Sequence, residues 1–128
     1  MSYLLDTHTF IWFDNDPDKL STLVAAICSS SDNDLLLSLA SVWEIQIKSQ
    51  LGKLQLPLPL PDMIQNQITR NRVELLPIEL SHILNLANLP PHHKDPFDRL
   101  LIAQAMSENV ILLSNDAKIE KYPVQILW

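Results

Sequence analysis

Short, uninterrupted apolar runs alternate with longer helical patterns, and this alternation constrains the fold of the chain most strongly. Three strong runs lie at residues 3–5, 35–37 and 110–113, and two weaker ones lie at residues 73–76 and 124–127. Strands that are apolar along their whole length suit a sheet covered on both faces, and strands separated by helices form parallel sheets. The pattern therefore predicts an α/β fold with three α/β/α layers and a central, mainly parallel sheet, whose weaker strands lie nearer an edge.

Helical patterns fill the intervals between these runs. Alternating prolines at Pro57, Pro59 and Pro61 force an extended connector in the middle of the chain. Asp95 followed by Pro96 is typical of an N-cap and a first helical residue, so this pair marks the start of the clearest helix. The predicted helices span residues 18–29, 40–51, 62–72, 79–89 and 96–109. Because we find no repeat and no interdomain linker, we expect residues 1–128 to form a single domain.

The composition excludes several kinds of site. The single glycine, Gly52, cannot form a glycine-rich phosphate cradle, and the single cysteine, Cys28, excludes an intramolecular disulfide and a cysteine-cluster metal site. No run approaches the roughly 20 apolar residues that cross a bilayer, so we expect a soluble, cytoplasmic protein without a membrane partner. The net charge of −6 disfavours a broad basic groove for nucleic acid.

Four acidic residues stand where a parallel sheet gathers its ligands. Asp6 follows the first apolar run directly, and Asp116 lies three residues beyond the run at residues 110–113. Ligands bind outside the carboxyl ends of parallel strands, so these two aspartates are expected at one edge of the sheet. Glu44, in the first turns of the second predicted helix, and Asp98, at the third position of the last one, can reach the same edge.

Taken singly, these acids also have local explanations. Carboxylates in first helical turns are favoured by the helix dipole, which accounts for Asp98 and Asp116 as local stabilisers, and Asp95 is explained by capping. Glu44, between Trp43 and Ile45, is harder to explain locally. Four converging carboxylates raise one another's pKa values, which is costly unless a divalent cation lies among them. Oxygen ligands suit Mg²⁺ or Mn²⁺, which activate water and stabilise charge on a phosphodiester.

Sequence segments across nearly the whole chain match one known family in their order. They are LLDTH at residues 4–8, SVWEIQIK at 41–48, LGKL at 51–54, DPFDRLLIAQA at 95–105 and LLSNDAKI at 112–119. In these segments the chain resembles the PIN-domain ribonucleases, and specifically the VapC-type toxins of type II toxin–antitoxin systems. The combination is highly specific, although each segment alone is modest evidence.

The resemblance implies a PIN-like fold and a metal-dependent endoribonuclease. It implies that one or two Mg²⁺ (or Mn²⁺) ions are held by an acidic quartet and activate water to hydrolyse RNA, leaving a 5′-phosphate and a 3′-hydroxyl. The quartet is carried here by Asp6, Glu44, Asp98 and Asp116, and Ser114 takes a supporting role, orienting Asp116 or a bound water. The resemblance further implies a cognate antitoxin protein that inhibits the toxin, and a homodimer.

Basic residues near the quartet are candidate RNA contacts. Lys48 lies four residues after Glu44 on the same helix face, and Arg99 follows Asp98 directly. Further candidates for phosphate contacts are Lys53, Arg70, Arg72 and Lys94. The alternative for each of these side chains is a solvated surface charge or an ion pair.

Other functions remain open beside this one. His92 and His93 are adjacent, so their side chains diverge, and a zinc site is disfavoured. A metal-free ribonuclease would need a histidine pair, such as His8 with His82 or His92, and would leave a 2′,3′-cyclic phosphate. A phosphotransferase with Asp6 as nucleophile is disfavoured because His8 stands where a second aspartate is expected. The non-enzyme alternative is a catalytically silent PIN-like module that binds a protein partner.

Overall fold

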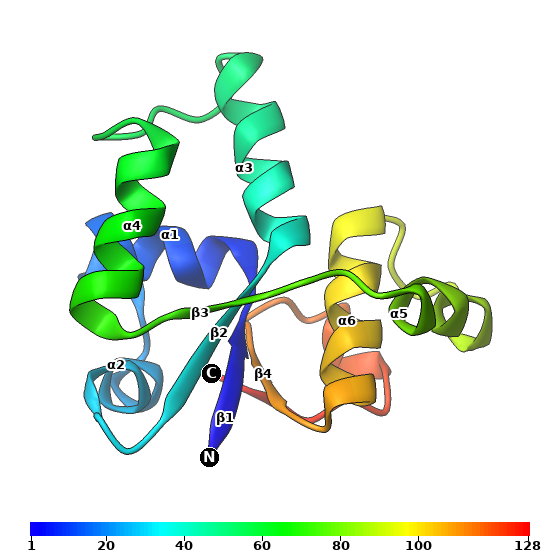
Figure 1. Cartoon of the computed structure of the whole chain (residues 1–128). Helices are drawn as coiled ribbons and strands as arrows, with labels where there is room; N and C mark the ends of the chain where they lie inside the picture. The colour runs from blue at the N-terminus through cyan, green and yellow to red at the C-terminus, as the bar shows by residue number, and fades with distance from the viewer.

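A five-stranded parallel sheet runs through the centre of the computed structural model, which describes all 128 residues (Figure 1). The strand order is β3-β2-β1-β4-β5, and every neighbouring pair is parallel. The strands are β1 (Ser2–Leu5), β2 (Asp34–Ser38), β3 (Glu74–Leu76), β4 (Ile111–Leu113) and β5 (Ile126–Leu127). The predicted parallel sheet is confirmed, and the two weaker apolar runs form its edge strands.

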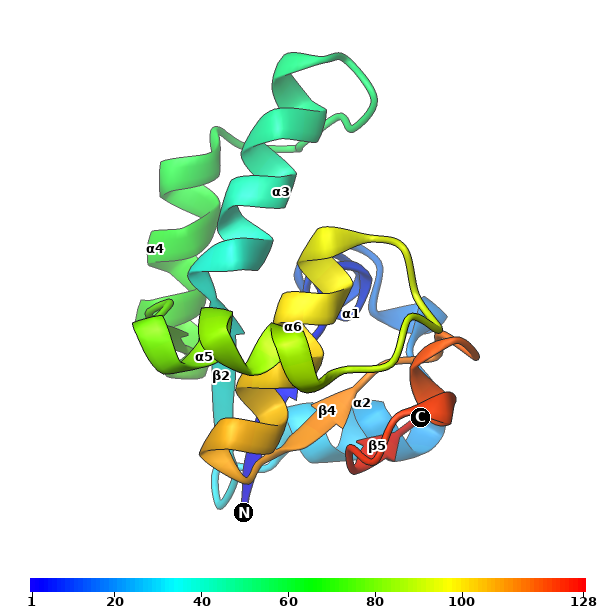
Figure 2. The ribbon, with the colours of Figure 1, turned by 90° about the vertical axis from the view of Figure 1, so that its right-hand side faces the viewer.

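Helices cover both faces of this sheet, because successive side chains of each strand point to opposite faces. Tyr3 and Leu5 enter one hydrophobic core, whereas Leu4 enters the other. The first core also receives side chains from α1 (Thr7–Asn15), α2 (Thr22–Ser29), α3 (Leu39–Gln50) and α4 (Leu60–Asn71). The second is covered mainly by α6 (Pro96–Glu108), with α5 (Leu80–Asn85) beside it, and Figure 2 shows α6 in front of the sheet and α2 behind it. The expected three-layer α/β/α arrangement is confirmed.

Three of the predicted helices match α3, α4 and α6 with ends that differ by at most two residues, while the others need correction. Helix α1 was not predicted, since its apolar residues at positions 10–13 are consecutive and show no helical spacing. The helix expected over residues 18–29 is divided into a 3₁₀ turn, η1 (Pro17–Lys19), and α2, which begins where the hydroxyl of Ser21 accepts from the N–H of Val24 at 3.1 Å. The helix expected over residues 79–89 ends early, and a 3₁₀ turn, η2 (Leu86–Asn88), follows α5. A further 3₁₀ turn is η3 (Ile119–Lys121).

The strand order reverses beside β1, and this reversal positions the candidate site. The chain moves outward from β1 through β2 to β3, then returns to place β4 on the other side of β1. Ligand-binding crevices of open α/β sheets form at such a reversal, outside the carboxyl ends of the strands. Here the N–H of Asp6 and the hydroxyl of Thr9 both donate to the carbonyl of Leu113, at 3.2 Å and 2.9 Å. The start of α1 is thereby fixed to the end of β4.

None of the helices has the length and apolar character that crossing a membrane requires.

Candidate metal centre

Asp6 is the N-cap of α1 and lies buried at the end of β1. Its Oδ1 accepts a hydrogen bond from the N–H of Thr9 at 2.8 Å. Burial raises the pKa of Asp6 above its ordinary value, although hydrogen bonds from Ser114 and Thr9 oppose the shift. The hydroxyl of Ser114, also buried, accepts from the N–H of Asp116 at 3.1 Å. Ser114 therefore contacts both the Asp6 carboxyl and the backbone of Asp116, an arrangement that suits the predicted supporting role.

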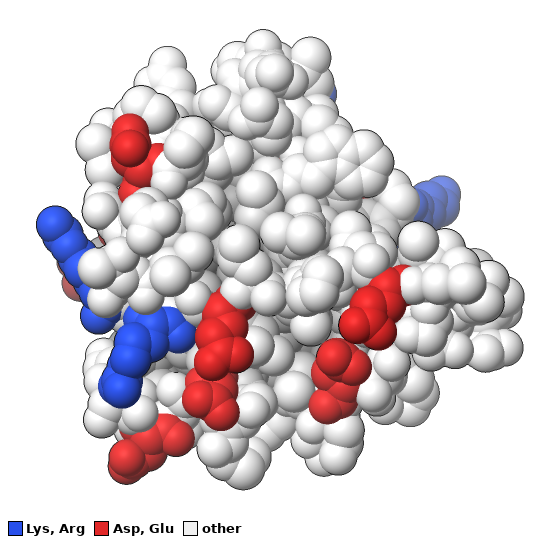
Figure 3. Space-filling view, viewed as in Figure 1, with Lys and Arg blue, Asp and Glu red and all other residues white.

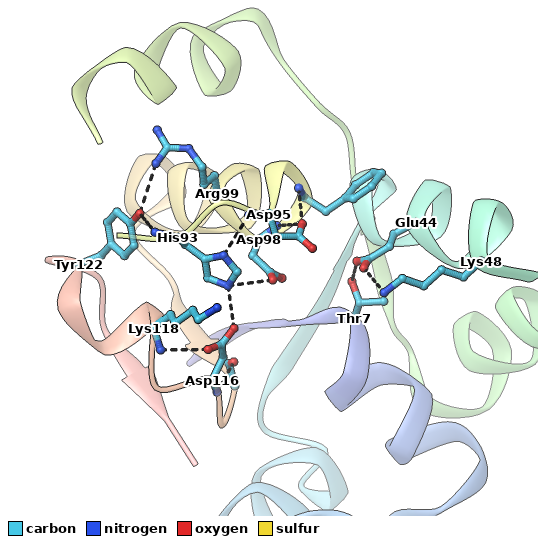
Figure 4. Close-up of polar contacts among 12 residues, drawn as sticks. Thr7, Glu44, Lys48, His93, Asp95, Asp98, Arg99, Asp116, Lys118 and Tyr122 are labelled. Atoms are coloured by element: carbon cyan, nitrogen blue, oxygen red, sulfur yellow. Dashed lines mark hydrogen bonds and ion pairs between the residues drawn. The ribbon is translucent and has the colours of Figure 1, made fainter. Parts of the chain in front are cut away.

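Glu44 is buried on α3, and both of its carboxylate oxygens have partners. The hydroxyl of Thr7 donates to Oε1 at 2.6 Å, and the ammonium of Lys48 donates to Oε2 at 2.6 Å (Figure 4). The hydrogen bond to Glu44 raises the pKa of Lys48, so this ammonium stays charged. The predicted RNA contact at Lys48 is thus also the ion-pair partner of a predicted metal ligand.

Asp98 and Asp116 meet around a histidine that the sequence did not point to. The Nε2 atom of His93 lies 2.8 Å from Oδ2 of Asp116 and 3.1 Å from Oδ2 of Asp98. These ligand atoms all lie within 4.8 Å of one another. Figure 4 shows the Asp98 carboxylate between this group and the Glu44 group. As predicted, Asp95 caps α6, where its Oδ1 accepts from the N–H of Phe97 at 2.8 Å and of Asp98 at 3.2 Å.

Hydrogen bonding fixes the tautomer of His93. Its Nδ1 accepts from the N–H of Asp95 at 3.1 Å, so in the neutral ring the proton resides on Nε2. The Nε2–H group therefore donates to Asp116, while its nitrogen also lies 3.1 Å from Oδ2 of Asp98, and it is not placed to coordinate a cation. Coordination through Nε2 would require the proton to move to Nδ1, at the cost of the hydrogen bond from Asp95. The structure thus favours His93 as a residue that orients two carboxylates.

Arg99 holds the loop that carries His93. Its guanidinium donates to the carbonyls of Pro90, Leu86 and Leu89 at 3.0 Å, 3.2 Å and 3.4 Å, and to the hydroxyl of Tyr122 at 3.3 Å. These four acceptors leave the side chain committed to the segment that precedes α6. The geometry favours a structural role for Arg99 over the RNA contact expected from the sequence, and we do not carry that contact forward.

The charges around Asp98 are unbalanced. Burial raises its pKa to about 7, the negative charge of Asp95 adds to this rise, and the nearby His93 opposes it. Glu44 and Asp6 raise the pKa of Asp98 further, so both carboxylates act on it although they lie outside the close His93 group.

Asp116 differs from Asp98 in the balance of its surroundings. Burial raises its pKa, but the hydrogen bond from His93 and the N–H of Lys118 outweigh this effect and lower the pKa overall. The donor set around Asp98 is therefore rich in oxygen and negative charge, which fits the hard cations Mg²⁺ and Mn²⁺. Such a cation would be held by Asp98 and Asp116, and Asp6 and Glu44 add negative charge that acts on Asp98.

Two contributors to the site were missed from the sequence. Thr7, which binds Glu44, was passed over although it directly follows Asp6. His93 was weighed only as half of a zinc-binding pair. Its side chain does diverge from that of His92, which packs edge-on against Tyr122 with ring centroids 5.3 Å apart. A signal was present, because a histidine two residues before the N-cap Asp95 stands at the same end of α6 as Asp98.

Comparison with known proteins places this fold in one class. The family model of the PIN domain matches residues 3–125. The chain therefore belongs to the PIN domain family, as the sequence segments indicated.

Individual relatives resemble it over nearly their whole length. Ribonuclease VapC22 from Mycobacterium tuberculosis is 25% identical over 120 residues, which are 93% of this chain and 90% of that protein. Among solved structures, VapBC2 from Rickettsia felis bound to a promoter DNA fragment has a TM-score of 0.74 at 18% identity, with 99% of this chain and 98% of that chain covered. FitAcB from Neisseria gonorrhoeae has a TM-score of 0.68 at 16% identity, with 98% and 96% covered. These structural similarities show the fold.

Proposed function

We propose that this chain is a metal-dependent endoribonuclease that acts as the toxin of a type II toxin–antitoxin system. The observation that carries the proposal is the Asp98 carboxyl, whose pKa is raised to about 7 by burial and by the charges of Asp95, Glu44 and Asp6. Burial raises the pKa of both Asp98 and Asp6, and a carboxyl that disfavours its own ionisation near neutral pH suits a site that takes up a cation. Membership of the PIN family and the likeness to a protein named as a ribonuclease support this reading.

In this proposal the residues of the site have separate tasks. A bound Mg²⁺ or Mn²⁺ would supply Lewis-acid chemistry, lowering the pKa of a water and stabilising charge on the phosphodiester. Asp98 and Asp116 would hold the cation directly, and Asp6 and Glu44, whose charges act on Asp98, would complete the acidic quartet. His93 fixes the orientation of the Asp98 and Asp116 carboxylates, because its Nε2 atom lies 3.1 Å from Oδ2 of Asp98 and 2.8 Å from Oδ2 of Asp116.

Glu44 lies on the α3 side of the site, and its ion pair with Lys48 places a positive charge there. Lys48 remains bonded to one of the Glu44 oxygens, so it can approach an RNA phosphate without leaving that carboxylate. The other carboxylate oxygen is held by Thr7. Hydrolysis at this site is expected to leave a 5′-phosphate and a 3′-hydroxyl.

Partners follow from the relatives. VapBC and toxin–antitoxin complexes recur among the similar structures, which supports a cognate antitoxin as the protein partner. The homodimer and the cytoplasmic location belong to the proposal through the family resemblance alone. The single-domain organisation over residues 1–128 is part of the same proposal.

The test is cleavage of labelled total RNA in Mg²⁺ or Mn²⁺ and in EDTA. Wild type should cut only with metal and leave ends that a ligase accepts as 5′-phosphates. Asp98→Asn should lower the cleavage rate by at least about 100-fold, because loss of a direct ligand should cost more than the 10–100-fold typical of outer-shell partners.

Asp95→Asn is the matched control. It makes the same substitution three residues earlier, and asparagine still caps a helix, so cleavage should largely persist. Equal losses in both variants would contradict the assigned roles. Cleavage that survives EDTA would point to histidine catalysis. Intact binding of an antitoxin without any metal-dependent cleavage would favour the catalytically silent binding module.

A further inference from the structure

A cleft of about 500 Å³ adjoins the Glu44 side of the acidic site. The residues that matter in its lining are Thr7, His8, Trp12, Lys19, Lys48 and Lys53. Thr7 and Lys48 line the cleft and also hold the two oxygens of Glu44. The cleft therefore lies next to Glu44, so a chain-like substrate that reaches the acidic site past Glu44 would extend into it.

Positive charge gathers in this cleft although the protein as a whole is acidic. Three lysines line it against one carboxylate, Asp16, in a chain of net charge −6. Lys19 is paired with Asp16 at 3.4 Å and Lys48 with Glu44 at 2.6 Å, whereas Lys53 forms no ion pair. By contrast, the face shown in Figure 3 carries scattered acidic groups, and its few basic groups lie at the left, at the lower left and at the right margin, apart from one another or beside acids. The cleft can therefore attract a phosphate although the protein is acidic, and Lys53 is the lysine of the cleft that is not engaged in an ion pair.

Aromatic rings accompany these lysines. Trp12, on α1, lies with its ring centroid 5.8 Å from that of Trp128 and 5.8 Å from that of His8. The edge-on contact with Trp128 supports a partly exposed indole at the wall of the cleft. Aromatic side chains beside lysines are the pattern of single-strand nucleic-acid binding, where bases stack and phosphates meet cations.

We propose that this cleft binds unpaired nucleotides of the RNA on one side of the phosphate that is cut. A base stacks in the cleft against Trp12 and His8, and the adjoining phosphate contacts Lys53. A cavity of about 500 Å³ lies within the range of small-ligand pockets and can hold an unpaired base. This assignment rests on the proposed ribonuclease function, and it names the residues that hold the RNA beside the phosphate that is cut.

Two variants test the cleft, and a third is their control. Binding of a fluorescein-labelled, mixed-sequence single-stranded RNA to protein carrying Asp98→Asn is measured by anisotropy over a range of salt concentrations. Adding Lys53→Glu should weaken binding about tenfold and flatten its salt dependence, since a phosphate contact is lost. Adding Trp12→Ala should weaken binding to a similar degree without changing the salt dependence, while Trp12→Phe retains most of the affinity. Lys121→Glu on η3 makes the same charge change away from the cleft and should bind nearly as the parent does.

A small substrate separates the cleft from the metal chemistry. Bis(p-nitrophenyl) phosphate offers a phosphodiester without neighbouring nucleotides, so Mn²⁺-dependent hydrolysis by Lys53→Glu and Trp12→Ala should equal that of wild type. Unchanged RNA affinity in both variants would overturn the cleft assignment and leave the ribonuclease proposal intact. Loss of hydrolysis only in Asp98→Asn supports the nuclease, whereas no hydrolysis by wild type counts against it. Variants that lose antitoxin binding but keep RNA affinity would show that the cleft holds a protein segment instead.

Discussion

The two sides of the acidic site hold their carboxylates by different means. On the α3 side, Glu44 receives a hydroxyl and a permanent cation, each at 2.6 Å. On the α6 side, Asp98 and Asp116 share the single Nε2 atom of one histidine, at 3.1 Å and 2.8 Å. On the α3 side each oxygen of one carboxylate has its own donor, whereas on the α6 side two carboxylates converge on one nitrogen.

This difference locates the need for a cation. The pKa of Asp98 rises to about 7 chiefly through burial, with the charge of Asp95 next, and the Lys48 ammonium beside Glu44 does not compensate for these effects. A divalent ion bound beside Asp98 and Asp116 would therefore offset the largest unfavourable charge interaction in the site, while Glu44, on α3, adds a further negative charge. The carboxyl whose ionisation is most unfavourable is thus Asp98, on the α6 side, and variants on the two sides can test this.

The largest expected effect is on stability as a function of pH in EDTA. The folded state keeps Asp98 protonated up to about pH 7, whereas the unfolded chain releases this proton near 3.8. Between these values the folded state binds more protons, so the free energy of unfolding falls as pH rises, by roughly 3 kcal/mol. The raised pKa of Asp6 acts in the same direction, and the lowered pKa of Asp116 acts below this window.

Urea unfolding at about pH 4.5 and about pH 7.5 measures this effect. Its control is Asp98→Asn, in which the slope due to this carboxyl disappears. If the free energy of unfolding of wild type falls no more steeply with pH than that of the variant, the raised pKa assigned to Asp98 is contradicted. Saturating Mn²⁺ should also reduce the slope, because the ion favours the ionised carboxylates.

Removing one charge from each side should have opposite effects. At about pH 8 in EDTA, Asp98→Asn should stabilise the fold by roughly 2 kcal/mol, since it removes the stressed carboxylate and keeps an acceptor for His93. Glu44→Gln should destabilise it by roughly 1–2 kcal/mol, because the charged hydrogen bond with Lys48 is lost. Thermal and urea unfolding of the two variants check the signs, and stabilisation by both would show that the two sides are alike.

Loss of the shared histidine should cost less and depend on metal. His93→Ala leaves Asp98 and Asp116 without their donor, so stability in EDTA should fall by roughly 1–2 kcal/mol. Mn²⁺ should recover much of this loss. In His93→Gln the amide can accept from Asp95 and donate to the carboxylates, so this variant is the matched control and should remain close to wild type. A His93→Ala protein that no longer binds Mn²⁺ would instead make the histidine a ligand.

The smallest expected effect separates capping from the site. At about pH 5, where the raised pKa keeps Asp98 protonated, Asp95→Ala should cost about 1 kcal/mol through the lost N-cap of α6. Asp95→Asn, which still caps, should cost only a few tenths of that figure. If both variants are equally destabilised, the charge of Asp95 and not its capping bond is what matters.

The fold was largely predictable because the strands are uninterrupted apolar runs and the strongest helix has a clear cap and first residue at Asp95 and Pro96. The shared edge of Asp6 and Asp116 followed from parallel topology alone. Helix α1 was missed because its apolar side chains are consecutive, and burial of Phe10 against the sheet selects the helix only in the folded context. The place of His93 depends on a loop that Arg99 holds through three distant carbonyls, and local sequence rules do not encode such contacts.

The most direct test of the account is a crystal structure of the protein with Mn²⁺, in which the anomalous signal locates the ion. The account predicts a peak at about 2–2.5 Å from carboxylate oxygens of Asp98 and Asp116. The Asp6 carboxyl should lie next to the ion, and Nδ1 of His93 should still accept a hydrogen bond from the N–H of Asp95. No peak among these carboxylates at saturating Mn²⁺, or an ion bound only through the histidine, would contradict the claim that this edge of the sheet is a metal centre.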